Sequence, residues 1–210
     1  MTDPKTGPEV PGGEWWPELG PQWKPTTAQK PQCLCIDVHS HLAVAESAAV
    51  AKPHFKPEMD PRSFFSPPES NRYNTELRMQ PHQVAKYHEP EARIEDMDKQ
   101  GIDMQLLSVV PPQYFYWLDP ENAIKACRIQ HERFAEIVAA YPDRFAAVAN
   151  LPMDHPQIAI EVMEEAKRDF GFNGFEISGD VNGEDLDDRR FDPIWEKAVE
   201  LDMTAILHPQ

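Results

Sequence analysis

The sequence predicts an α/β fold in which short strands alternate with helices and form a parallel sheet. Apolar runs of strand length recur between segments with helical periodicity. The run at 104–110 is almost continuously apolar, as expected of a parallel strand that is buried on both faces. Polar residues, above all histidines, follow the ends of two of these runs. Together these observations are compatible with a doubly wound sheet or with part of a (β/α)8 barrel.

The expected elements follow one another regularly along the chain. Strands are expected at 34–38, 104–110, 145–151, 174–178 and 204–207, and helices at 91–101, 119–141, 156–170 and 191–201. Gly101 is a typical helix end, and Pro120 directly after Asp119 is a typical helix start. The connection 42–90 is rich in proline, so we expect an insertion with little long regular structure. Residues 1–31 are predicted to form an irregular Pro-rich arm, and 32–210 a single domain.

Two features favour the barrel over the doubly wound sheet. No Gly-rich phosphate loop follows the first strand, which argues against a nucleotide-binding sheet. His39, His41 and His208 come just after the ends of predicted strands, and barrel active sites are built at the carboxyl ends of the strands. We therefore expect a TIM-barrel-type fold of which about the first five β/α units are present.

The same three histidines predict a metal site. His39 and His41 are one residue apart at a strand end, where the period of two directs both imidazoles to the same side. Two such imidazoles can bind one divalent ion, and His208 adds a third at the equivalent level of another strand. A lone histidine at position 208 would more often be a hydrogen-bonded core residue, so the argument depends on the pair.

Composition limits the partners and the compartment. The net charge of −16 and the pI of about 4.8 indicate an acidic surface, which repels phosphate backbones and anionic lipids. We expect no nucleic acid and no membrane as partners. Cys33, Cys35 and Cys127 show no CxxC spacing and are expected to be reduced. The N-terminus lacks the pattern of a signal peptide, so the expected location is the cytoplasm.

Several short stretches occur in an order that matches a known family. They are 37–41, 93–98, 101–103, 107–111, 116–117, 141–145, 150–153, 171–174 and 207–209. In these stretches the chain resembles the amidohydrolase superfamily, specifically the branch of aminocarboxymuconate-semialdehyde decarboxylase and related decarboxylases and hydrolases. The resemblance covers roughly residues 33–210.

The resemblance implies a barrel enzyme with one metal ion, usually Zn²⁺, and a homodimeric assembly. His39, His41 and His208 are the implied metal ligands. A catalytic histidine after strand six and a last ligand, an aspartate, after strand eight are also implied, at positions beyond 210. The stretch 174–178 contains no lysine, which favours one metal ion over two. In that stretch we expect Glu176 to be a hydrogen-bonded strand residue rather than a bridging ligand.

The implied activity is metal-dependent decarboxylation of a small unsaturated or aromatic carboxylic acid. Hydrolysis of an amide, ester or lactone with the same ligands is the alternative, and an inactive barrel fragment is the second alternative. Tyr116 and Trp117 lie in an aromatic loop after the second strand and suit a planar substrate, although loop packing explains them equally well. Arg78 is a candidate clamp for a substrate carboxylate, with a solvated surface role as the alternative.

Overall fold

The computed structural model describes residues 33–56 and 81–209. The chain divides into two units, Met1–Gln32 and Cys33–Gln210, and the description below concerns the second unit. The predicted arm at 1–31 and the candidate substrate clamp Arg78 lie outside the described residues. Within the described ranges, no helix is long and apolar enough to cross a membrane.

Six strands of the unit form two parallel sheets and follow chain order. One sheet has the order β1 (Ile36–Leu42), β2 (Met104–Val109), β3 (Phe145–Ala147), and another has the order β4 (Ala149–Asn150), β5 (Gly174–Ser178), β8 (Thr204–His208). Val148 alone separates β3 from β4, and its N–H donates to the carbonyl of Leu107 over 3.0 Å. Within these two sheets, each strand lies beside the next parallel strand in the sequence. The strand order therefore does not reverse direction, as it does in a doubly wound sheet.

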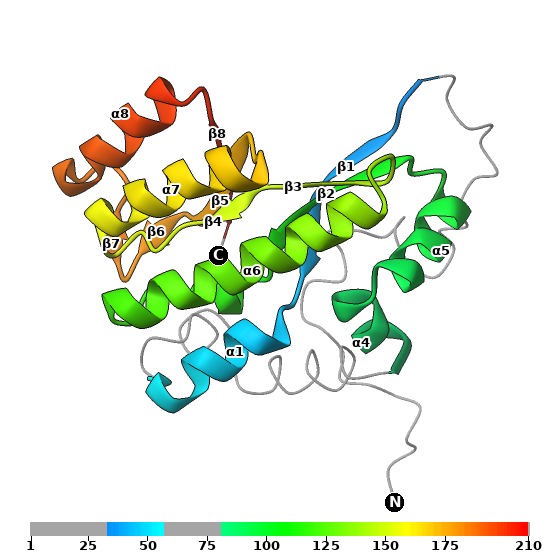
Figure 1. Ribbon diagram of the computed structural model, residues 1–210, viewed down its shortest axis with the longest axis horizontal. Coiled ribbons are helices and arrows are strands. Elements are labelled where there is room, and N and C mark those ends of the chain that lie inside the picture. The colour runs from blue at the N-terminus through cyan, green and yellow to red at the C-terminus, as the bar shows by residue number, and fades with distance from the viewer. Residues whose placement is uncertain (1–32, 57–80, 210) are drawn as a thin grey trace, which may run out of the picture. The chain divides into compact units, whose positions relative to one another are not determined.

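Helices cover one face of these strands, which is called the outer face below. The longer ones are α5 (Pro90–Gln100), α6 (Pro120–Ala140), α7 (Pro156–Phe170) and α8 (Asp192–Glu200). Figure 1 shows α6, α7 and α8 side by side along one side of the strands. The predicted irregular connection contains two short helices, α1 (Ala45–Ala51) and α4 (Pro81–His88). Single 3-10 turns occur at η1 (Lys52–His54), η3 (Pro111–Gln113) and η4 (Arg189–Phe191).

The helix boundaries follow the signals in the sequence, whereas two strands, β1 and β8, end later than predicted. Gly101 ends α5 in a left-handed conformation with φ of 74°. Asp119 caps α6 by accepting the N–H of Asn122, as its position before a proline suggests. By contrast, β1 and β8 include the three candidate metal histidines, which were expected just after the strands. These side chains therefore project from the strands themselves and not from the loops that follow them.

One antiparallel hairpin is absent from the sequence-based prediction. It consists of β6 (Asp180–Val181) and β7 (Glu184–Asp185). Its two turn residues, Asn182 and Gly183, have left-handed φ values of 55° and 84°. A two-residue turn of this type favours Asn-Gly, so this dipeptide is the signal that would have revealed the hairpin.

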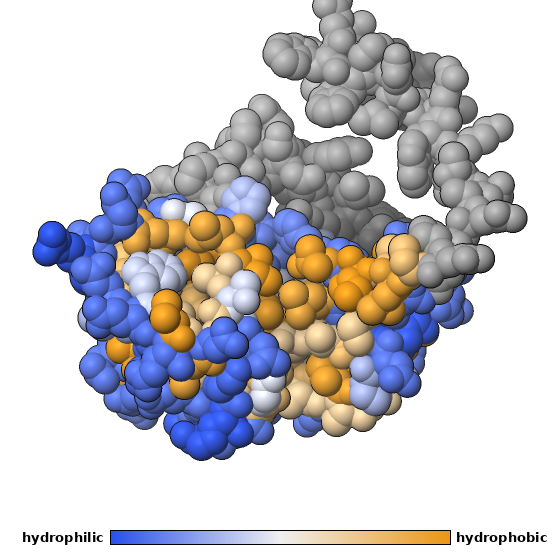
Figure 2. Space-filling view, turned by 90° about the horizontal axis from the view of Figure 1, so that it is seen from above, coloured by the Kyte–Doolittle hydropathy of each residue, from blue (hydrophilic) through white to orange (hydrophobic). Residues whose placement is uncertain are grey.

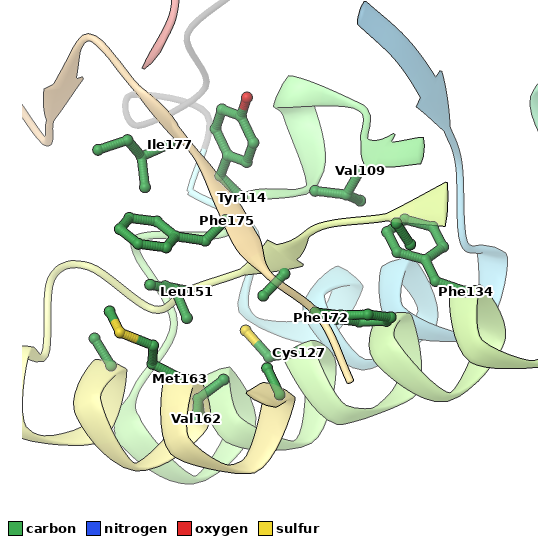
Figure 3. Packing of buried hydrophobic residues seen from close by; sticks show 14 of the residues in the cluster. Val109, Tyr114, Cys127, Phe134, Leu151, Val162, Met163, Phe172, Phe175 and Ile177 are labelled. Atoms are coloured by element: carbon green, nitrogen blue, oxygen red, sulfur yellow. The ribbon is translucent and has the colours of Figure 1, made fainter. Parts of the chain in front are cut away.

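The hydrophobic core lies between the strands and the outer helices. Figure 3 shows Phe175 of β5 and Leu151, directly after β4, facing Met163 and Val162 of α7. The ring of Phe175 also stacks against Trp195 of α8, with the centroids 6.4 Å apart. Burying a large apolar side chain contributes roughly 1.5–3 kcal/mol, so this packing fixes which face of β5 meets the helices. The alternate residues of β5 are thereby directed to the opposite face.

Gly174→Ala is expected to destabilise the fold, because the added Cβ would lie 2.7 Å from the backbone oxygen of Thr204 on β8. The two strands would have to separate, which should lower the free energy of unfolding in urea by about 1–3 kcal/mol. Gly179→Ala is the control, since its Cβ would meet no atom closer than 3.8 Å. Equal stability changes in the two variants would contradict the close approach of β5 and β8.

His131 of α6 predicts a pH dependence of stability. Burial lowers its pKa to about 4, and its Nε2 accepts the N–H of Asn150 over 3.0 Å. The unfolded chain, with a histidine pKa of ~6.5, takes up the proton first as the pH falls. The stability that His131 contributes is therefore complete above about pH 6.5 and is lost between about pH 6.5 and 4.

The test compares the free energy of unfolding across that pH window in three proteins. His131→Gln should show a shallower pH dependence than the wild type, because it removes the buried titrating group. His54→Gln changes an exposed histidine and should keep the wild-type slope. An unchanged slope in His131→Gln would show that another group causes the dependence.

Candidate metal centre

Three histidines from distant parts of the sequence meet at the carboxyl ends of two strands. The Nε2 atom of His41 lies 2.9 Å from Nε2 of His39 and 3.0 Å from Nε2 of His208. His39 and His41 belong to β1, and His208 is the last residue of β8. The structure thus brings together the three histidines that the sequence singled out as metal ligands.

The arrangement of the three rings fits a shared divalent cation. A hydrogen bond between two imidazoles needs one donor and one acceptor nitrogen, whereas the single Nε2 of His41 faces two others. Ligand nitrogens ~2.0–2.1 Å from a tetrahedral ion lie about 3.3 Å apart, close to the separations observed. Burial, and then His208 and His39, lower the pKa of His41 to about 4, so its neutral, ligating form dominates at neutral pH. Among the described residues, these histidines form a group that could hold an ion.

A β-bulge sets the direction of the two histidines on β1. Asp37 pairs with Gln105 of β2, but His41 pairs with Ser108, so β1 contains one extra residue between these pairs. In a regular strand Asp37 would share a face with His39 and His41. The bulge instead turns Asp37 to the other face, where its carboxylate accepts from Gln105 Nε2 over 2.9 Å. The site therefore presents imidazoles without this neighbouring carboxylate.

Buried polar groups support His41 from the inner face of the strands. Ser108 Oγ lies 3.0 Å from His41 Nδ1, and with Nε2 directed to an ion, the Nδ1–H donates to this hydroxyl. Glu176 Oε1 lies 3.7 Å from the same nitrogen and accepts from the hydroxyl of Tyr114 over 2.8 Å. Burial, and then the Glu176 carboxylate, raise the pKa of Tyr114, so its hydroxyl remains a donor. Glu176 has the hydrogen-bonded role on β5 that the sequence suggested.

Arg93 of α5 supports the same strand from the outer face. Its Nη1 donates to Ser40 Oγ over 2.6 Å and to Gln105 Oε1 over 3.3 Å, and its Nη2 donates to the carbonyl oxygen of His41. Burial lowers the pKa of Arg93 to about 10, partly offset by Tyr87 and Asp37. The guanidinium is therefore still charged at neutral pH.

The aromatic loop after β2 directs successive rings to opposite sides. Phe115 adopts a φ of 54°, which is rare for a bulky residue. The ring of Tyr114 lies 6.5 Å from that of His208 and stacks on Tyr116 with the centroids 5.5 Å apart. Figure 3 shows Tyr114 beside β5, with its hydroxyl directed away from the core. Tyr114 is thus an aromatic ring of this loop that lies close to the histidines.

The two described residues that were predicted to bind substrate, Tyr116 and Trp117, contact other residues of the unit. The hydroxyl of Tyr116 is buried and accepts the N–H of Ser178 over 3.2 Å. Trp117 is half-buried and packs edge-to-face on Phe115. Sequence reasoning assigned no role to Ser108 or Arg93. Both residues lie in stretches that match the family, 93–98 and 107–111, but neither stretch indicated a contact with the histidines.

Comparison with known families agrees with this geometry. The family model described as "Amidohydrolase" matches residues 36–210. The chain belongs to the amidohydrolase family. Among curated relatives, it is 31% identical over 121 residues to 2-amino-3-carboxymuconate-6-semialdehyde decarboxylase of Dictyostelium discoideum, a match that covers 58% of this chain and 34% of the relative. It is 34% identical over 128 residues to gamma-resorcylate decarboxylase of Rhizobium sp. (strain MTP-10005), covering 57% of this chain and 38% of that enzyme.

Solved amidohydrolase-type structures share the fold of the described unit. The structure of 2,6-dihydroxybenzoate decarboxylase complexed with 2,6-dihydroxybenzoate has a TM-score of 0.64 and 26% identity, and the match covers 84% of this chain and 51% of that chain. The 5-carboxyvanillate decarboxylase of Novosphingobium aromaticivorans, complexed with manganese and 4-hydroxy-3-methoxy-5-nitrobenzoic acid, has a TM-score of 0.69 and 24% identity over 85% and 51% of the two chains. The chain therefore spans about half of these structures and little more than a third of the curated relatives.

Replacing both β1 histidines, His39→Ala with His41→Ala, is expected to abolish stoichiometric metal binding by the full-length protein, because only one of the three convergent nitrogens remains. Elemental analysis after gel filtration measures the bound metal. His155→Gln is a matched control, since this histidine contacts the carbonyl of Leu118 rather than the cluster. Full metal occupancy in the double variant would refute the assignment of the site.

Proposed function

We propose that the full-length protein is a metal-dependent decarboxylase acting on an unsaturated or aromatic carboxylic acid. The observation that carries this proposal is the convergence of three Nε2 atoms, 2.9 and 3.0 Å apart, at the ends of β1 and β8. The two curated relatives named above are decarboxylases, which favours loss of carbon dioxide over hydrolysis.

The proposed roles of the residues follow from their contacts. His39, His41 and His208 would hold one divalent ion through Nε2. Bound there, the divalent ion would supply Lewis-acid chemistry toward an oxygen atom. Ser108 accepts the Nδ1–H of His41 and so keeps the Nε2 lone pair directed to the ion position. We propose Zn²⁺, for which three imidazoles are a common ligand set, with Mn²⁺ as the alternative to test.

The substrate we propose is a small carboxylic acid with a planar, conjugated body. The ring of Tyr114 lies 6.5 Å from that of His208, so an aromatic group stands beside the proposed metal position. Tyr116, Trp117 and Arg78 remain predicted substrate contacts. The homodimer and the cytoplasmic location implied by the sequence likewise remain predictions.

We propose that the strands form part of a (β/α)8 barrel. The strands of the two three-stranded sheets are parallel and in chain order. The first and the last of them, β1 and β8, carry exposed apolar side chains. These side chains are Ile36 and Val38 of β1 and Leu207 of β8. Figure 2 shows a broad hydrophobic area on one face of the unit. Apolar edge strands normally pair or are covered, so this pattern supports further strands and helices packed against both edges.

The activity test uses the full-length protein loaded with Zn²⁺ or Mn²⁺ and two sets of substrates. Dihydroxybenzoates and unsaturated dicarboxylates should release carbon dioxide, measured from ¹³C-labelled carboxylates, whereas lactones should remain closed. Lactone opening without carbon dioxide release from any acid would contradict the decarboxylase and support the hydrolase. Absence of both reactions in a metal-loaded protein would support the inactive alternative.

A further inference from the structure

We propose that Arg93 is a positioning residue of the metal centre, which holds the backbone of both β1 histidines in the geometry that the ion requires. The inference rests on the proposed metal site and goes beyond it, because the hydrogen bonds of Arg93 go to Ser40, Gln105 and the His41 carbonyl rather than to an imidazole. It acts through the strand that carries the ligands.

The bulge in β1 makes such support necessary. Regular pairing with β2 fails between Asp37 and Ser40, which is the segment that contains His39. A bulge leaves its extra residue outside the ladder and bends the strand locally. The ladder hydrogen bonds therefore restrain His39 less than they restrain a residue in a regular strand, although the metal site needs both rings to be fixed.

One guanidinium reaches the backbone of both ligands. Arg93 Nη2 donates directly to the carbonyl oxygen of His41, and Nη1 donates to Gln105 Oε1. The other end of the Gln105 amide donates to Asp37 Oδ2, and Asp37 Oδ1 accepts the N–H of His39 over 3.1 Å. This chain of donors and acceptors connects the strand before the bulge to the strand after it.

The planar guanidinium of an arginine can bind these acceptors together, whereas the ammonium group of a lysine cannot. The acceptors of Arg93 are the Ser40 hydroxyl, the Gln105 amide and the His41 carbonyl, spread over two strands. A guanidinium presents several donors in a fixed plane, whereas a lysine presents a single point charge on a flexible stem. Met97 anchors α5 in the hydrophobic core, and Arg93 connects this helix to the strand that carries the ligands.

The structure also provides a matched control. Arg144 donates from Nε to the carbonyl of Asp103 over 2.9 Å and from Nη2 to Asp98 Oδ1 over 2.8 Å. Like Arg93, it is a partly buried arginine that donates hydrogen bonds to backbone carbonyls. It lies at the amino end of β2, away from the histidines. Arg144→Gln should therefore lower stability through the loss of arginine hydrogen bonds to the backbone, without disturbing the metal ligands.

The experiment measures the affinity of the full-length protein for Zn²⁺ by chelator competition, the absorption spectrum of the Co²⁺ form, and the thermal midpoint of the metal-free protein. Arg93→Gln should weaken Zn²⁺ binding by about tenfold to a hundredfold and alter the Co²⁺ ligand-field bands, since supporting residues of metal sites have effects of this size. Arg93→Lys should rescue only part of the loss. Arg144→Gln should keep the wild-type affinity and spectrum, even where its thermal midpoint falls.

Wild-type affinity and spectrum in Arg93→Gln would overturn the positioning role while leaving the metal site intact. A wild-type protein that binds neither Zn²⁺ nor Co²⁺ would refute the site itself, and the positioning role with it. If Arg93→Gln does not fold, Ser40→Ala and Gln105→Leu each remove one contact of the guanidinium and should still weaken Zn²⁺ binding. Unchanged affinity in both of these variants would also overturn the proposal.

Discussion

Parallel strand alignment is the constraint on which the candidate site depends. His41 and His208 are separated by 167 positions in the sequence, yet their Nε2 atoms lie 3.0 Å apart. Parallel strands end at one edge, and His41 near the end of β1 meets His208 at the end of β8. Core packing such as Phe175 against Trp195 fixes which face of each strand meets the helices. The imidazoles lie on the opposite face of the strands, where they converge.

Support for the ligands comes from both faces of the strands. On the inner face, Ser108 orients the ring of His41 through Nδ1. On the outer face, Arg93 holds the carbonyl of the same residue. A ring fixed at its nitrogen and at its backbone loses little freedom when it binds an ion, which is the usual requirement for a precise metal site.

Much of this arrangement is predictable from local sequence patterns. The helix 156–170 and the helix end at Gly101 follow from apolar periodicity and from glycine at a left-handed position. The clustering of the three histidines follows from the spacing of His39 and His41 and from the level of His208 in a parallel sheet. These inferences succeed because each depends on a single element or on the common direction of the strands.

Other features depend on contacts that no local pattern encodes. The bulge in β1 arises from pairing with β2, and it reverses the face on which Asp37 lies. Arg93 gains its role from a contact across 52 positions, which spacing alone does not reveal. The ring of Tyr114 lies 6.5 Å from that of His208, beside the left-handed Phe115, although the rings predicted from the sequence to bind substrate were those of Tyr116 and Trp117.

X-ray absorption at the metal edge of the full-length protein, loaded with one equivalent of Zn²⁺, identifies the ligand atoms of the bound ion. We expect three imidazole nitrogens in the first coordination shell at ~2.0–2.1 Å, together with the outer-shell scattering that is typical of imidazole rings. A first shell of oxygen or sulfur ligands without imidazole scattering would contradict the assignment of His39, His41 and His208 as one metal site.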